Sequence, residues 1–349
     1  MEYGDFGEIY IQCASNTNGG VPGRLTSKQV QKDNYFSSAT VVAHLADPLF
    51  NGAITYSAPD DGVPIGGHGI EVFAAGTRNP WGIFLHSNGN IYASDNGPNY
   101  SYGDMMTGCG PGQFKPDVTE GDKINLLRKG GYYGTPNRIR ALTHNDTRQC
   151  VWRSQFEPSD NGYTAPILRA TSSTDGLIEF HADHFYKQLR GNLIAAKYQG
   201  SLYRIVLSPD GNSVIPQSNP YIELTVDVDA LDVTQAPDGT LVSTSLDRNA
   251  IYFHKPIEET TTQMKILSVY PRRGGEGGGN TLQLHGVNFD SFTTVAVNRR
   301  NCPITSFTTT KIECTLPGGV GTVDIVASSG AQTYNFERGY RYVTGLPRP

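Results

Sequence analysis

The sequence predicts an all-β protein in which a partial β-propeller is followed by a C-terminal immunoglobulin-like β-sandwich. Glycine (40 residues) and proline (21 residues) are abundant, and only 17% of the residues are charged, a balance that favours short strands joined by tight turns. No stretch keeps a helical spacing of apolar residues over two or more turns, whereas Tyr, Thr and Val are frequent. These observations exclude a helical fold.

The propeller is predicted from a recurring unit, a glycine-containing turn followed by a strand of alternating apolar residues. The last two turns are about 48 residues apart, which is the length of one propeller blade, and the earlier ones are about twice as far apart. A β-sandwich of unrelated strands is the alternative. The four turns are Asp5-Phe6-Gly7 before 8–12, Asn88-Gly89 before 90–94, Gly191 before 192–197, and Asp238-Gly239 before 240–244.

A change of pattern near residue 258 predicts a domain boundary. The run Glu-Glu-Thr-Thr-Thr-Gln at 258–263 is polar and offers no core residues, so we expect a linker that acts as a hinge crossed by few contacts. Beyond it, about seven short alternating strands in about 80 residues indicate a sandwich. The predicted domains are 1–257 and 265–345, with 258–264 as the linker.

Charge and hydropathy exclude two classes of partner. The net charge of −5 and the pI of about 5.9 argue against nucleic acid, and the Arg299-Arg300 pair is too small a basic patch to bind it. No apolar run is long enough to cross a bilayer. Met1 leads directly into the first strand without a signal peptide, so an extracellular chain of this kind is expected to be a fragment.

Cysteines and sequons indicate an extracellular or cell-surface protein. Cys302 and Cys314 flank one short hairpin-like segment and are placed to form a disulfide. Cys109 and Cys150 are a candidate second pair, which leaves Cys13 odd; five buried thiols in a cytosolic protein is the alternative. Glycosylation is predicted at Asn99 and Asn145, in the tripeptides Asn-Tyr-Ser and Asn-Asp-Thr.

The C-terminal unit resembles an IPT/TIG domain, the immunoglobulin-like fold of plexin-type receptors. The resemblance covers 265–344 and rests on "ILSVYPRRGGEGGGNTLQLHGVNF", "NCPITSFTTTKIECTLPGGVGTVDIVASSG" with its cysteine pair, and "FERGYRYV". It implies a spacer or adhesion module. The loop Gly274–Gly279 lacks the GK[ST] ending and the following helix of a phosphate-binding loop, so a turn is expected.

The longer N-terminal region resembles the glucose/sorbosone dehydrogenase family, β-propellers that use pyrroloquinoline quinone (PQQ) and calcium. The resemblance rests on "GTRNPWGIFLHSNGNIYASDNGPN" (76–99), "GDKINLLRKGGYYGTP" (121–136) and, more weakly, "GNLIAAKYQGSLYRIVL" (191–207). It implies a six-bladed-type propeller of which this chain holds a part, because the match begins where the second or third blade would be under way.

Site residues follow from the resemblance by position. Arg78 and Asn79 would contact the anionic quinone, and Lys197 would meet a cofactor carboxylate. The backbone carbonyls of Gly97 and Pro98 would bind calcium, which prefers hard oxygen ligands. The alternative is a rigid blade turn in which Arg78 binds carbonyl groups.

Three departures from the family pattern weaken the enzyme interpretation, and no catalytic residue is assigned. The base histidine of the family would fall before Met1. Asp229 and Leu231 occupy the positions of two arginines that hold a cofactor carboxylate. The family's Asp-Glu pair is replaced by Asp122-Lys123.

The remaining histidines do not match the position of the family base. We expect His68 and His86 to lie in surface turns, and His181-Ala182-Asp183-His184 to end a strand rather than bind a metal, since nothing nearby completes a ligand set.

Two functions of different class therefore remain. The first is an extracellular recognition or adhesion protein whose propeller binds a carbohydrate or an extracellular protein without turnover. The second is a PQQ- and calcium-dependent sugar dehydrogenase. The loss of the two arginines favours the first.

Overall fold

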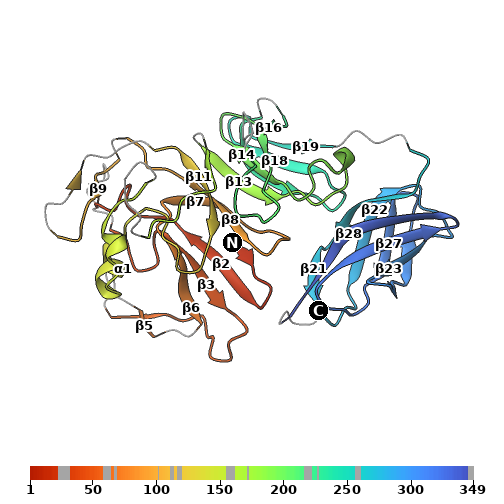
Figure 1. The fold of residues 1–349 in the computed structure, drawn as a ribbon, viewed down its shortest axis with the longest axis horizontal. Helices are drawn as coiled ribbons and strands as arrows, with labels where there is room; N and C mark the ends of the chain where they lie inside the picture. Colours follow the sequence, from red (N-terminus) through yellow and green to blue (C-terminus); the bar gives the residue numbers. More distant parts are fainter. Residues whose placement is uncertain are drawn as a thin grey trace.

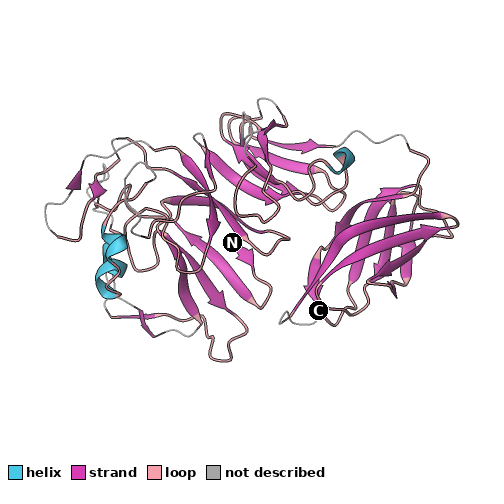
Figure 2. Ribbon diagram, in the orientation of Figure 1, coloured by secondary structure: helices cyan, strands magenta, loops and turns pink. Residues whose placement is uncertain are grey.

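The chain folds almost entirely into β-strands, as predicted (Figures 1 and 2). A computed structural model describes residues 1–22, 32–57, 64–66, 69–100, 102–110, 114–115, 120–154, 162–170, 173–215, 222–225, 228–255 and 261–344. His68 and the linker residues 258–260 lie outside the described residues. The propeller-type part comes first along the chain, and the sandwich follows at the right of Figure 1.

In the propeller-type part, the described residues form four antiparallel sheets of three or four strands, each built like a blade. In sheet order they are β1 (Glu2–Tyr3), β2 (Glu8–Cys13), β3 (Ala39–His44) and β6 (Ile70–Ala75); β7 (Asn79–Leu85), β8 (Ile91–Asn96), β11 (Asp122–Leu127) and β12 (Leu168–Ala170); β13 (Thr174–Glu179), β14 (Leu193–Lys197), β15 (Leu202–Ile205) and β16 (Ile222–Glu223); and β17 (Ala230–Gln235), β18 (Leu241–Ser245) and β19 (Ala250–His254).

The sheets pack face to face through apolar layers, as propeller blades do. Strand β13 lies against both β7 and β17, and β7 also lies against β1 and β2. Tyr92, Leu177 and Leu193 fill the layer between the second and third sheets, and Phe180 and Val233 lie in the layer between the third and fourth. The first residues of β7 and β13 therefore lie at one end of the sheets, and their last residues lie at the opposite end.

Smaller elements cover one side of the first two sheets. They include α1 (Arg138–Thr143), whose first turn is capped by the side chain of Asn137, and a disulfide that joins Cys109 to Cys150. The other short elements there are β4 (Thr55–Tyr56), β5 (Pro64–Gly66), β9 (Met105–Met106), β10 (Phe114–Lys115) and η1 (Thr147–Cys150). The turn η2 (Phe185–Lys187) lies elsewhere, after β13, where Lys187 lies 5.1 Å from the centre of the Tyr334 ring of the sandwich.

The sandwich consists of two sheets around one apolar core that includes Leu284, Phe289 and Ile325. A disulfide joins Cys302 to Cys314 inside this core, the pairing expected from the sequence. One sheet has the order β20 (Lys265–Tyr270), β22 (Thr281–Val287), β26 (Lys311–Thr315) and β25 (Ile304–Phe307); the other has β21 (Arg273–Gly275), β28 (Gln332–Val343), β27 (Thr322–Ser329), β23 (Thr294–Val297) and β24 (Arg300–Asn301).

The hinge crossed by few contacts stays a prediction, and individual polar contacts join the two domains. The backbone N–H of Asp183 donates to the carbonyl of Leu267 at 2.7 Å, and the Tyr334 hydroxyl donates to the Asp183 carboxylate at 2.7 Å. Arg273 of the sandwich also forms an ion pair with Glu2 at 2.6 Å. The linker composition carries no information about these surfaces, because they come from segments far from it in sequence.

Candidate functional site

The Arg78-Asn79 turn is held by one buried carboxylate at the start of β7. The backbone N–H groups of Arg78 and Asn79 both donate to Oδ1 of Asp95, at 2.9 and 3.0 Å. Asp95 is fully buried on β8, and burial raises the pKa of its carboxyl group, while Lys123 at 3.7 Å opposes this shift. Two N–H donors aimed at one oxygen fix the turn, so the side chains of Arg78 and Asn79 start from a rigid backbone.

Lys123, which stands where the family pattern has a glutamate, has a structural role. Its ammonium group lies 3.7 Å from Asp95 and 5.5 Å from the centre of the Trp152 ring, and its side chain is almost fully buried. The basic residue thus compensates a buried carboxylate that supports the turn. A sequence pattern alone does not reveal this pairing, because Asp95 and Lys123 lie on different strands of the sheet.

A chain of hydrogen bonds connects Asn79 to the next sheet. Its side-chain amide donates to Asn96 at 3.0 Å, and Asn96 in turn donates to Asp122 at 2.9 Å and to the carbonyl of Thr174 at 3.0 Å. The backbone N–H of Thr174 returns a hydrogen bond of 2.6 Å to Asp122. Thr174 is paired with Lys197 across β13 and β14, so the structure brings Asn79 and Lys197 to the same end of adjacent sheets.

Asp175, next to Thr174 on β13, lies at the same end of the sheets and was not predicted from the sequence. Burial, together with the nearby carboxylates of Asp122 and Asp232, raises the pKa of Asp175 from 3.8 to about 6. Its side chain contacts Ser173 and Asn96. The position of Asp175 within an alternating strand gave no signal, because the side chain becomes close to other carboxylates only when the sheets assemble.

Arg78 is a cation with a neutral partner. Its guanidinium group donates to Oδ1 of Asn18 at 3.1 Å, and Asn18 also accepts from the backbone N–H of Asn99 at 3.1 Å. Burial lowers the pKa of Arg78, and the more distant carboxylates of Asp95 and Asp122 oppose that shift. A half-buried guanidinium paired with an amide retains capacity for an anionic or strongly polar ligand.

The two positions that depart from the family pattern lie close to Lys197. The backbone N–H of Asp229 donates to the carbonyl of Gly200 at 2.9 Å, in the hairpin that follows Lys197. The carboxylate of Asp229 lies 3.5 Å from Nε of Arg248. Leu231 follows on β17 and supplies no charge. This part of the site therefore holds one carboxylate and one arginine that already pairs with it.

The proposed calcium ligands are buried beside Asp122. The N–H of Gly97 donates to Asp122 at 3.0 Å, and a side chain at position 97 would collide with the carbonyl oxygen of Glu120. The carbonyl of Pro98 accepts a hydrogen bond of 3.4 Å from Glu120. The described residues contain no cluster of three or more His, Cys, Asp or Glu side chains able to hold a metal.

The predicted glycosylation sites lie on exposed residues. Asn99 and Asn145 are both exposed, and Asn145 adopts a positive φ of 52° in the turn after α1. Ser101, the third residue of the first sequon, lies outside the described residues. Exposure makes both asparagines accessible to a modifying enzyme.

The expectation of an exposed turn for His86 is wrong. His86 is buried after the end of β7, where it contacts the carbonyl of Gly191 at 3.1 Å, and His181 is partly buried after the end of β13. Both lie at the end of the sheets opposite to Asn79 and Thr174. Among the residues that the structure describes, no histidine contacts Arg78, Asn79 or Lys197.

The described residues do not fit a tricarboxylate such as PQQ well. Arg78 and Lys197 supply two cations, but Asp229 introduces a carboxylate, and Asp122 and Asp175 lie along the same end. A ligand with three carboxylates would face repulsion from these groups. The arrangement better suits a ligand that is neutral or carries one anionic group.

Comparisons with known proteins give two family matches. The model for "Glucose / Sorbosone dehydrogenase" matches residues 52–252, which is more than half of the chain, and the model for "IPT/TIG domain" matches residues 264–340. No curated protein matches this chain.

Solved structures resemble the chain at low identity. They include the PQQ-bound aldose sugar dehydrogenase from Streptomyces coelicolor (14% identity, TM-score 0.35, 64% of this chain and 49% of that chain). They also include the PQQ domain of pyranose dehydrogenase from Coprinopsis cinerea (15%, TM-score 0.44, 71% and 66%) and the family AA12 protein from Trichoderma reesei (12%, TM-score 0.42, 72% and 65%). The chain thus spans about half to two thirds of the length of these structures.

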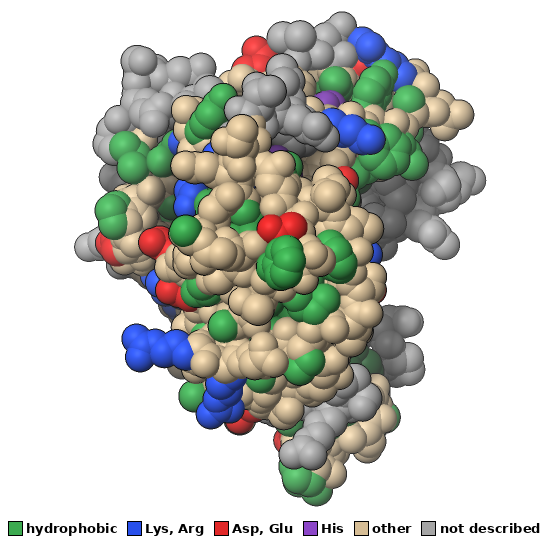
Figure 3. All heavy atoms as spheres, turned by 90° about the vertical axis from the view of Figure 1, so that its right-hand side faces the viewer, with side chains coloured by type: hydrophobic (Ala, Val, Ile, Leu, Met, Phe, Trp, Pro, Cys, Tyr) green, Lys and Arg blue, Asp and Glu red, His purple; other side chains and the backbone are tan. Residues whose placement is uncertain are grey.

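No helix within the described residues is both long and apolar enough to span a membrane. Figure 3 shows one face of the molecule, on which the Lys and Arg side chains are dispersed rather than gathered in one patch.

Proposed function

Because the chain belongs to the glucose/sorbosone dehydrogenase family and carries an IPT/TIG domain after the family region, we propose that it is an extracellular recognition protein. Its ligand is a carbohydrate, bound at the end of the sheets marked by Arg78, Asn79 and Lys197, without oxidation. The two disulfides support an extracellular location, since such bonds persist in oxidising compartments. In this proposal the sandwich serves as a spacer or as a contact for a second extracellular protein.

One observation carries this proposal: Asp229 and Leu231 stand where the family places two arginines, and Asp229 forms an ion pair with Arg248. The carboxylate lies next to the hairpin of Lys197, so it competes with a cofactor carboxylate for the cation. A neutral sugar avoids this competition, because its hydroxyl groups both donate to carboxylates and accept from Arg78 and Lys197.

An exposed aromatic side chain near Arg78 supports a sugar ligand. Tyr102 is 69% exposed and lies close enough to Arg78 to oppose the fall in its pKa. Flat aromatic faces combined with planar polar groups provide both an apolar and a hydrogen-bonding surface, which suits the faces of a pyranose ring.

The test measures sugar binding and turnover on the same preparation. A glycan array followed by calorimetric titration should identify a saccharide that binds the wild-type chain, and Arg78→Ala should weaken its binding at least tenfold. Arg128→Ala is the matched control, because Arg128 is exposed after the opposite end of β11 and contacts Asn90 and Asn212. Equal weakening by the two variants, or no saccharide bound, would contradict the proposed site.

The second candidate is a PQQ- and calcium-dependent sugar dehydrogenase, favoured by the pair of cations Arg78 and Lys197. Within the described part of the chain, no ion pair involves Lys197; its ammonium group lies 5.9 Å from the centre of the Tyr203 ring. The carbonyls of Gly97 and Pro98 would hold the calcium, which would polarise a quinone carbonyl. A dye-reduction assay with PQQ and calcium decides: turnover above the free-cofactor background, lost in Arg78→Ala, would replace the first proposal.

A further inference from the structure

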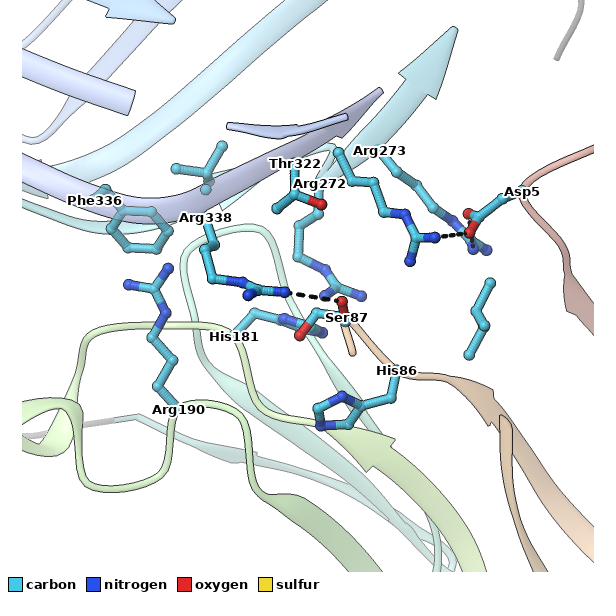
Figure 4. Close-up of a pocket in the computed structure, with 14 residues that line it drawn as sticks. Asp5, His86, Ser87, His181, Arg190, Arg272, Arg273, Thr322, Phe336 and Arg338 are labelled. Atoms are coloured by element: carbon cyan, nitrogen blue, oxygen red, sulfur yellow. Dashed lines mark hydrogen bonds and ion pairs between the residues drawn. The ribbon is translucent and has the colours of Figure 1, made fainter. Parts of the chain in front are cut away.

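A small pocket rich in arginine lies between the propeller-type domain and the sandwich. Its cavity is about 50 Å³, and it is lined by Ser87, His181 and Arg190 on the propeller side and by Arg272 and Arg338 on the sandwich side. Figure 4 shows the Arg272 and Arg338 side chains extending from the sandwich toward Ser87 and His181. The pocket is at the end of β7 opposite to Arg78, so it is separate from the proposed sugar site.

Three of the five arginines that line the pocket already have acidic partners. Arg190 forms an ion pair with Asp183 and stacks on the Phe336 ring, with 3.8 Å between the guanidinium carbon and the ring centre. Arg273 pairs with Glu2 at 2.6 Å, and Arg341 pairs with Asp5. These three side chains link the two domains. Because acidic partners already compensate their charges, the uncompensated positive charge of the pocket comes from Arg272 and Arg338.

Arg272 and Arg338 have no carboxylate partner among the described residues. The guanidinium group of Arg338 makes a long contact of 3.5 Å with the carbonyl of Ser87, and that of Arg272 lies 5.8 Å from the centre of the Phe84 ring. Burial lowers the pKa of Arg272 to about 10, and the positive charge of Arg273 adds to this effect. Arg272 remains protonated at neutral pH, which leaves a partly buried cation to be compensated.

Glu179, a carboxylate on the propeller side that attracts Arg272 electrostatically, is already engaged by other donors. One oxygen accepts from the Ser87 hydroxyl at 2.6 Å, and the other accepts from the Ser87 backbone N–H at 2.7 Å. The ring nitrogens of His181 and His86 lie 3.3 and 3.6 Å from the same carboxylate. Glu179 thus contributes to the field at Arg272 without a direct hydrogen bond to it.

We propose that this pocket binds a tetrahedral oxyanion, sulfate or phosphate, either free or at the end of a saccharide. The anion would lie between Arg272 and Arg338, which present planar donor groups that suit its oxygens. One water molecule needs about 10–15 Å³ of cavity volume. The cavity of about 50 Å³ therefore accommodates three or four waters or one sulfate or phosphate group, but not a whole sugar ring. Both arginines come from the sandwich, and Ser87 and His181 line the propeller side of the same pocket, so the bound anion would lie between the two domains.

The test titrates the intact chain with anions at constant ionic strength. Sodium sulfate and sodium phosphate should each raise the melting temperature by a few degrees relative to sodium chloride, and calorimetry should show one site per chain. Arg272→Gln should weaken binding at least tenfold, and Arg338→Gln, which changes an exposed side chain, keeps the test valid if the first variant folds poorly. Arg299→Gln is the matched control, an exposed arginine at a turn of the same sandwich.

Glucose 6-sulfate distinguishes the two sources of the anion. Binding at least tenfold tighter than inorganic sulfate would assign the group to a saccharide, whereas equal or weaker binding would assign a free ion, and both outcomes support the pocket. The proposal fails if sulfate and phosphate behave like chloride, or if Arg272→Gln and Arg338→Gln bind sulfate as tightly as Arg299→Gln. Arg78→Ala should leave this binding unchanged, so the two proposals can fail separately.

Discussion

Replacement of the buried Arg140 by methionine should destabilise the propeller-type domain more than any exposed substitution on the same helix. Arg140 is 1% exposed on α1 and donates to the backbone carbonyls of Tyr35 at 2.7 Å and Ser38 at 2.9 Å, and also to that of Ser37. Its Nε donates to Gln149 at 2.8 Å. Methionine fills much of the volume but satisfies none of these acceptors.

The magnitude follows from the hydrogen bonds that are lost. Four hydrogen bonds from a charged donor, three to backbone carbonyls and one to Gln149, at about 1 kcal/mol each, give a loss of about 3–5 kcal/mol in the free energy of unfolding. The effect should extend to the candidate site, because the Ser38 carbonyl also accepts from the N–H of Gly76 at 2.7 Å, two residues before Arg78. We therefore expect weaker ligand binding together with a melting temperature lower by about 10 °C.

Thermal unfolding followed by circular dichroism measures this loss, with Arg138→Met as the control. Arg138 lies on the same helix and is exposed, so its replacement should change the free energy of unfolding by less than about 0.5 kcal/mol. If the two variants were destabilised equally, the argument from the lost hydrogen bonds of Arg140 would be refuted.

Three further changes probe the sandwich and the carboxylates of the candidate site. Joint replacement of Cys302 and Cys314 by serine should lower the free energy of unfolding of the sandwich by about 3 kcal/mol, because the bridge closes a segment with a separation of 12 residues. Urea unfolding measures it, and Cys13→Ser, at a free thiol, should show no such loss. The folded state keeps a proton on Asp175 up to about pH 6, whereas the unfolded state releases it near 3.8, so stability should fall as the pH rises through this window. Asp175→Asn should abolish that fall in melting scans between pH 4 and 7, and identical slopes would speak against it. Residues 261–345 expressed alone should give dispersed amide signals, since the core of the sandwich comes from its own strands; a collapsed spectrum would place the boundary elsewhere.

Much of the fold was predictable because it depends on local alternation and turns. The strands β22 and β27 each alternate buried and more exposed residues, and the same alternation of apolar and polar residues is visible in the sequence. The Arg78-Asn79 turn was also predictable as a motif, and its convergence with Lys197 follows from adjacent blades. A motif thus predicts which backbone position carries a given side chain.

The contacts that decide the chemistry were not predictable, because they join distant segments. Asp229, just before β17, forms an ion pair with Arg248, which follows β18, and Lys123 on β11 forms one with Asp95 on β8. His86 follows a turn-like sequence, yet it is buried because the loop around Gly191 covers it. Periodicity describes which face of a strand is buried, and it does not report which loop packs on the end of that strand.

The two proposed sites lie at opposite ends of the same strands, and this arrangement has a consequence for how they communicate. Strand β7 runs from Asn79 at the sugar site to Leu85 beside the arginine pocket, and β13 runs from Thr174 to Glu179 in the same direction. Seven residues at about 3.3 Å each separate the ends by about 20 Å, beyond the screening length of about 8 Å for exposed charges. Direct electrostatic coupling between an anion in the pocket and a ligand near Arg78 is therefore weak. Because the two sites are far apart and share no partner, the effects of Arg78→Ala and Arg272→Gln should add within about 0.5 kcal/mol, and a larger coupling would require a movement of one blade against the next.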